Sequence, residues 1–190
     1  MHPILYHNNF ITKVKQMLKV RRIINLNAPI MAVYLVYLRG ILNRADLFYL
    51  GKGHGLNWLI VEDEGDIRNL VVMLCQVWGH TPMPYDNGLK VWDWLDELEA
   101  GQYTGAMPEF ALMDIRMPGR RGDEISQRMR TIEALKNIPI VLMTAFIMNE
   151  EEVERMRQTF GVDSVINKPL PDFDRLKQII DKIIADKAGS

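Results

Sequence analysis

Four apolar segments of this sequence lead into polar residues that could take part in phosphoryl or metal chemistry. These are Glu62 and Asp63 after "WLIV", Asp114 at the end of "EFALMD", Thr144 at the end of "IPIVLMT", and Lys168, followed by Pro169, after "DSVIN". A carboxylate that closes a buried strand is costly unless it is paired, bound to a metal ion or used in a reaction. The residues therefore raise the question of which reaction they serve.

Three crowded carboxylates repel one another, and a hard divalent cation relieves that repulsion. Mg²⁺, for which Mn²⁺ could substitute, suits a site of a few carboxylates, a carbonyl and retained waters. Lys168 would then offer a positive charge to phosphoryl oxygens, and Thr144 would offer a hydrogen bond. A carboxylate can itself act as the nucleophile and form an acyl phosphate. Asp114, in the middle of the strand order, is the natural candidate.

The elements that would position these residues alternate along the chain. Strands are expected at about 58–63, 80–86, 108–114, 138–145 and 163–169, and helices at about 65–79, 87–101, 122–135, 149–161 and 172–187. Pro82 and Pro84 make the second strand the weakest. Short strands joined by helices predict a doubly wound α/β fold, with a parallel sheet covered on both faces. Ligands of such sheets bind outside the carboxyl ends of the strands, where the polar residues stand.

Charge divides the sequence into two parts, a basic extension at 1–55 and a domain at 56–190. The first part holds eight Lys/Arg against the single acid Asp46, and the second fifteen Lys/Arg against twenty-three Asp/Glu, so the net charge of −1 hides an asymmetry. The single cysteine, Cys75, allows no intrachain disulfide, which fits a cytoplasmic protein. The longest apolar run, Ala28 to Leu38, is shorter than the roughly 20 residues that span a bilayer.

The basic extension permits several interpretations. The segment "ITKVKQMLKVRRII" has a helical apolar pattern with a basic polar face. Such a helix could contact an acidic membrane surface, a partner protein or a nucleic acid. It matches no DNA-binding motif, so direct DNA binding is not expected. The plainest interpretation is an extension without a settled structure, or upstream sequence translated from an early start.

Residues from about Trp58 to Lys187 resemble the receiver domain of two-component response regulators. The resemblance rests on "LIVEDE" (59–64), "LMDIRMPG" (112–119), "VLMTA" (141–145) and "INKPL" (166–170), in this order with helical patterns between them. It implies a flavodoxin-like (βα)₅ sheet in which Asp114 accepts a phosphoryl group from a sensor histidine kinase or a histidine phosphotransfer protein. It also implies roles for the other site residues: Glu62, Asp63, Asp114 and the backbone carbonyl of Arg116 hold the metal, Thr144 and Lys168 are the switch hydroxyl and the phosphate-contacting amine, and Pro169 follows a cis peptide bond.

Two departures from the family pattern bear on function. An aromatic residue often stands three positions before the lysine in that family, but Val165 stands there in this chain. A valine has few rotamers and little reach, so we expect Phe146 and the loop to Glu150 to carry the output change instead. Arg120 and Arg121 follow the Met-Pro-Gly turn and are interpreted as solvated loop charges.

Two other functions fit part of the pattern. A magnesium-dependent aspartyl phosphatase usually needs a second acid two residues after the nucleophile, and Arg116 stands there. A degenerate receiver that only binds partners would not need the complete set of site residues. We therefore expect a signalling module rather than a metabolic enzyme, one that catalyses its own phosphorylation and dephosphorylation. Because the sequence ends at its last helix, we expect its signal to pass to a separate output protein.

Overall fold

The computed structural model describes residues 55–189 of the chain, and the expectations for 1–54 lie outside this part. Its elements alternate between strand and helix, as the sequence predicts. In chain order they are β1 (Asn57–Val61), α4 (Gly65–Val77), β2 (Thr81–Tyr85), α5 (Gly88–Glu99), β3 (Phe110–Asp114), α6 (Gly122–Met129), β4 (Ile140–Thr144), α7 (Glu150–Phe160), β5 (Ser164–Asn167) and α8 (Phe173–Ala188). The strands form one parallel sheet in the order β2-β1-β3-β4-β5. The predicted flavodoxin-like fold is therefore confirmed.

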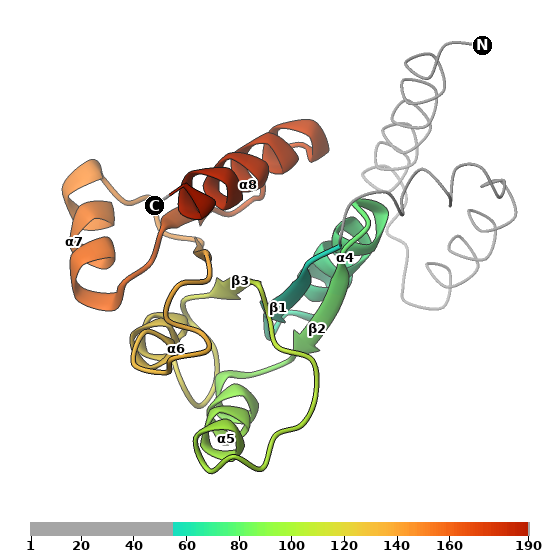
Figure 1. Cartoon of the computed structure of the whole chain (residues 1–190). Helices are drawn as coiled ribbons and strands as arrows, with labels where there is room; N and C mark the ends of the chain where they lie inside the picture. The colour runs from blue at the N-terminus through green and yellow to red at the C-terminus, as the bar shows by residue number, and fades with distance from the viewer. Residues whose placement is uncertain (1–54, 190) are drawn as a thin grey trace, which may run out of the picture. The chain divides into compact units, whose positions relative to one another are not determined.

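One face of the sheet packs against α5, α6 and α7 (Figure 1). Side chains alternate between the two faces of a strand. The residues on this face are Leu59 and Val61 of β1, Ala111 and Met113 of β3, and Ile140 and Leu142 of β4, and they form one core with Val91, Trp94 and Leu95 of α5, Ile125 and Met129 of α6, and Met156 of α7. The central strands are apolar on both faces because helices cover both.

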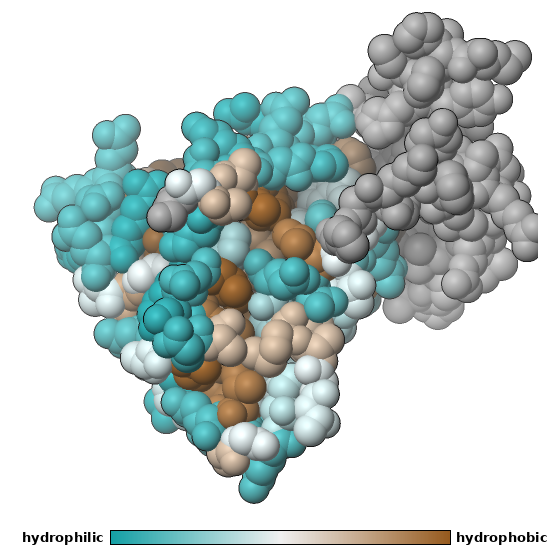
Figure 2. Space-filling model, viewed as in Figure 1, coloured by the Kyte–Doolittle hydropathy of each residue, from teal (hydrophilic) through white to brown (hydrophobic). Residues whose placement is uncertain are grey.

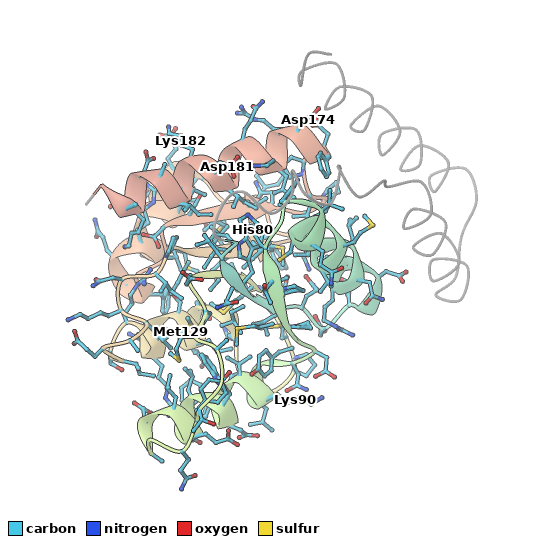
Figure 3. All side chains as sticks on the ribbon, turned by 45° about the vertical axis from the view of Figure 1, so that its right-hand side comes forward. His80, Lys90, Met129, Asp174, Asp181 and Lys182 are labelled. Carbon is cyan, nitrogen blue, oxygen red and sulfur yellow. The ribbon has the colours of Figure 1, made fainter. Side chains whose placement is uncertain are left out.

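The opposite face meets α4 and α8. Trp58 at the start of β1 packs against Phe110 of β3 and against Trp78 at the end of α4, and Trp78 in turn contacts Phe173 of α8. His80, labelled in Figure 3, stacks on Trp58 with ring centroids 4.7 Å apart. These rings lie at the amino ends of the strands, so they are at the opposite edge of the sheet from the polar residues at the carboxyl ends.

The outer sides of α7 and α8 are hydrophilic. Figure 2 shows hydrophilic residues over α7 and α8, with hydrophobic residues emerging between the elements in the middle of this view. In α7 only Met156 is buried, whereas acids occupy its first turn, where they suit the helix dipole. No helix within residues 55–189 is long and apolar enough to cross a membrane.

The third helix of this domain, α6, ends earlier than the sequence predicts. The apolar pattern favours a helix over 122–135, but α6 stops at Met129 and turns follow. The hydroxyl of Thr131 donates to the carbonyl of Arg128, which competes with helical pairing. The guanidinium of Arg130 donates to the carbonyls of Lys136 and Ile138 at 3.0 and 2.7 Å and thereby folds the segment back on itself. The prediction was wrong because these side-chain bonds are not visible in the periodicity.

Candidate phosphoryl-transfer site

The polar residues predicted from the sequence meet at the carboxyl edge of the sheet. Asp63, Asp114, Thr144 and Lys168 line one cleft, together with Arg116 and Phe146. The strands position them directly, because Asp114 ends β3, Thr144 ends β4 and Lys168 follows β5. Asp63 is exposed in the loop between β1 and α4. Four segments distant in sequence thus supply the walls of a single cleft.

Lys168 connects the two buried acids. Its Nζ lies 2.7 Å from Oδ1 of Asp114, 3.0 Å from Oε1 of Glu62 and 2.8 Å from Oε2 of Glu62. Glu62 is 0% exposed, and Asp114 is 5% exposed. Two buried acids therefore share one ammonium group.

The protonation of this cluster follows from its burial. Burial raises the pKa of the Glu62 carboxyl above its usual value, although the bond from Lys168 works in the opposite direction. Burial alone would lower the pKa of the Lys168 amine, but the hydrogen bonds to Asp114 and Glu62 raise it. Lys168 is therefore a cation at neutral pH.

The loop after β3 holds the Asp114 carboxylate from the other side. The backbone N–H of Arg116 donates to Oδ2 of Asp114 at 2.6 Å. This loop returns so closely that a Cβ at Gly122 would lie 2.2 Å from the carbonyl oxygen of Asp114. Gly119 has a φ of +85°, which glycine adopts without strain. The glycines of "MPGRRG" are therefore structural requirements for orienting the acid.

Thr144 and Phe146 form the opposite wall. Thr144 is buried, and its Oγ1 accepts a hydrogen bond from the backbone N–H of Phe146 at 3.1 Å. The guanidinium of Arg116 stacks over the Phe146 ring, 3.9 Å from its centroid. This cation–π contact joins the loops after β3 and β4 across the cleft. The sequence did not indicate this contact, because no periodic pattern links Arg116 to Phe146.

The donor set fits a hard divalent cation. Asp63 and Asp114 offer carboxylates to the same cleft, and the backbone N–H of Arg116 bonds to Asp114. Mg²⁺ commonly binds one or two carboxylates and keeps several waters, so this set is sufficient. Within residues 55–189 no group of three or more His, Cys, Asp or Glu side chains has the arrangement of a metal site. Glu62 is buried and paired with Lys168, which also pairs with Asp114.

Other predicted residues lie beside the cleft or away from it. The peptide bond between Lys168 and Pro169 is cis. Arg121 pairs with the buried Asp123, with the closest atoms 2.6 Å apart, and Arg120 stacks over Trp92, so neither guanidinium is a cleft wall.

A sequence profile of the response regulator receiver domain family matches residues 58–181. Among curated proteins, the chain is 32% identical over 112 residues to the polar-differentiation response regulator DivK of Brucella anthropi, which covers 59% of this chain and 83% of DivK. It is also 32% identical over 117 residues to the cyclic di-GMP phosphodiesterase response regulator RpfG of Xanthomonas campestris, which covers 61% of this chain. The matched region spans only 29% of RpfG, so the likeness concerns one part of that protein.

Solved structures show the same fold. The receiver domain of the sensor histidine kinase PA1611 from Pseudomonas aeruginosa superposes with a TM-score of 0.56 at 21% identity, covering 69% of this chain and 98% of that one. That structure has a magnesium ion coordinated in its active-site cleft. The profile match covers more than half of the chain. It includes all five strands except Asn57, the first residue of β1. The chain therefore belongs to the family of response regulator receiver domains.

Proposed function

We propose that this protein is a phosphoryl-accepting switch in which Asp114 takes a phosphoryl group from a sensor histidine kinase or a histidine phosphotransfer protein. The observation that carries the proposal is the contact of 2.7 Å between Oδ1 of Asp114 and Nζ of Lys168 in a cleft that Asp63 and Thr144 also line. A buried carboxylate beside a fixed cation, at the open edge of a rigid sheet, is well placed to act as a nucleophile.

Transfer of the phosphoryl group exchanges a P–N bond of the donor for an O–P bond to Asp114. An oxygen of the Asp114 carboxylate attacks the phosphorus of the donor, an O–P bond forms, and the P–N bond to the donor imidazole breaks. The imidazole keeps the electron pair of the broken bond. The Lys168 ammonium is positioned to attract the phosphoryl oxygens, and the Thr144 hydroxyl can donate to one of them once it turns toward the cleft. The Arg116 N–H orients the acid throughout.

Asp63, Asp114 and the backbone carbonyl of Arg116 are the residues that would hold Mg²⁺, or Mn²⁺ in its place. The bound cation would offset the negative charge that gathers when a phosphoryl group approaches two carboxylates. We assign Glu62 a supporting part, because its buried carboxylate is occupied by Lys168. The neighbouring Asp63, which is exposed, is the more accessible ligand.

Two alternative functions have less support. An aspartyl phosphatase would need an acid at the position of Arg116, whose guanidinium lies on Phe146 and cannot serve as a general acid. A receiver that only binds partners would have no need of the pairing among Glu62, Asp114 and Lys168, which costs desolvation to maintain. The complete cluster favours the phosphoryl-accepting function.

We propose that the protein acts in the cytoplasm as a signalling module and passes its state to a separate output protein. We propose that the conformational change begins at Thr144, whose Oγ1 accepts a hydrogen bond from the backbone N–H of Phe146. If the hydroxyl turns toward a phosphoryl group, this bond is released, and the loop from Phe146 to Glu150 is free to move. Val165 has no ring that could follow such a motion.

Labelling by a small phosphodonor tests the proposal. The full chain, incubated with acetyl phosphate and Mg²⁺, should gain the mass of one phosphoryl group, and Asp114→Asn should gain none. Asp86→Asn, a matched change at an exposed acid after β2, should be labelled like the wild type. Equal labelling of Asp114→Asn would overturn the assignment. Catalytic turnover of phosphomonoesters would instead support the phosphatase, and an unlabelled wild type would support the degenerate module.

A further inference from the structure

One arginine holds the backbone of the loop that carries the metal-binding acids. The guanidinium of Arg68 donates to the carbonyl oxygen of Glu62 at 2.7 Å and to that of Asp63 at 3.2 Å. The backbone N–H of the same residue donates to the carbonyl of Glu64 at 2.9 Å. Three consecutive carbonyls of the loop between β1 and α4 are therefore fixed by a single residue.

The position of Arg68 shows how it acts on the site. It lies in α4, is half-buried, and is not a wall of the cleft, whereas Asp63 is. Its contacts with the loop are to carbonyl oxygens, so it reaches the acids only through the backbone. Hydrogen bonds from a charged donor are stronger than those between neutral groups, and here both bonds come from Nη1, whose two hydrogens serve the two carbonyls.

The loop has few other constraints on the direction of Asp63. The N–H of Glu62 donates to the carbonyl of Tyr85 at 3.1 Å, which extends the pairing of β1 by one residue. The N–H of Glu64 donates to Oε1 of Glu62 at 3.3 Å. Asp63 itself is exposed, and the backbone that carries it sets the point from which its carboxylate reaches the cleft.

We propose that Arg68 is a positioning residue of the metal site: by holding the carbonyls of Glu62 and Asp63 it directs the Asp63 carboxylate into the cleft and sets the affinity for the divalent cation. This inference rests on the proposed function. Groups that orient metal ligands typically change metal affinity by about tenfold or more when they are removed. Neither the spacing nor the charge pattern of the sequence marks Arg68 for this role.

Direct measurement of Mg²⁺ binding to the full chain by calorimetry tests the inference without any phosphodonor. Arg68→Ala should raise the Kd for Mg²⁺ about tenfold. Arg68→Lys keeps the charge but not the planar guanidinium geometry that brings Nη1 to both carbonyls, so its Kd should lie between those of the wild type and the alanine variant. Arg155→Ala, at an exposed arginine of α7, is the matched control and should leave the Kd unchanged.

The outcomes separate this inference from the proposed function. Wild-type protein that binds no Mg²⁺, or binds it equally after Asp63→Ala, contradicts the proposed metal site. If Asp63→Ala abolishes binding while Arg68→Ala leaves the Kd unchanged, only the role of Arg68 is overturned. A merely structural arginine would lower the urea midpoint in EDTA and leave the Kd of the folded protein alone. If Arg68→Ala does not fold, Arg68→Lys and Arg68→Gln decide, and a wild-type Kd in both overturns the inference.

Discussion

Replacing Lys168 by methionine should destabilise the protein strongly, and the loss should depend on pH. The change removes the ammonium group that lies within 3.0 Å of the Glu62 carboxylate, which is 0% exposed, and also takes away the cation paired with Asp114. Breaking a buried ion pair by removing one partner costs about 3–5 kcal/mol, because a charge remains buried without compensation. We therefore expect the free energy of unfolding at pH 8 to fall by about that amount.

The pH dependence follows from the Glu62 carboxyl. Burial raises its folded pKa above the value of 4.5 expected for an unfolded chain, and loss of the bond from Lys168 raises it further. Between these two values the folded state holds a proton that the unfolded state lacks, so stability falls as the pH rises through this window. The penalty of Lys168→Met should therefore be largest above the folded pKa and should shrink as the pH falls toward 4.5.

Urea unfolding in EDTA between pH 5 and pH 8 measures this penalty from the shift in midpoint. Lys177→Met is the matched control, because Lys177 pairs with Asp181 on an exposed helix surface, where such pairs contribute about 0.3–0.5 kcal/mol. Adding Glu62→Gln to Lys168→Met should recover part of the loss, since a neutral amide is less costly to bury than a charge. A penalty that equals the control, or that does not change with pH, would refute the reasoning.

Three further predictions concern the loop after β3, the output route and the extension. Gly122→Ala should lower the free energy of unfolding by about 1–3 kcal/mol in urea, because its Cβ would overlap the Asp114 carbonyl at 2.2 Å. Phe146→Ala should weaken the beryllofluoride-induced change in hydrogen exchange of α7, whereas Val165→Ala should preserve it; the reverse result would exclude the route through Phe146. A shortened chain that begins at Leu56 should fold and be labelled by acetyl phosphate at a similar rate, since the N–H and carbonyl of Leu56 already pair with His80 and Thr81; an unfolded or unlabelled product would show that the extension is required.

The strands and their polar ends were predictable because each signal is local. An apolar run such as "FALMD" indicates both that β3 is buried and where it ends. The parallel order of the strands then brings Asp114 near Lys168. Contacts made by long side chains across loops leave no such local signal. The bonds from Arg68 to two carbonyls and the stack of Arg116 on Phe146 depend on how loops approach one another, which periodicity does not encode.

The two prolines of β2 limit strand pairing at this edge of the sheet. The N–H of Thr81 points toward β1, where it donates to Leu56, so Pro82 and Pro84 occupy the alternate positions that face away from the sheet. Those positions would otherwise present N–H donors to a passing chain, and proline has none. This border of the sheet therefore offers carbonyls without donors at both positions and is a poor template for strand addition by another molecule. The residues that make β2 a weak strand thus guard a signalling protein against edge-to-edge aggregation.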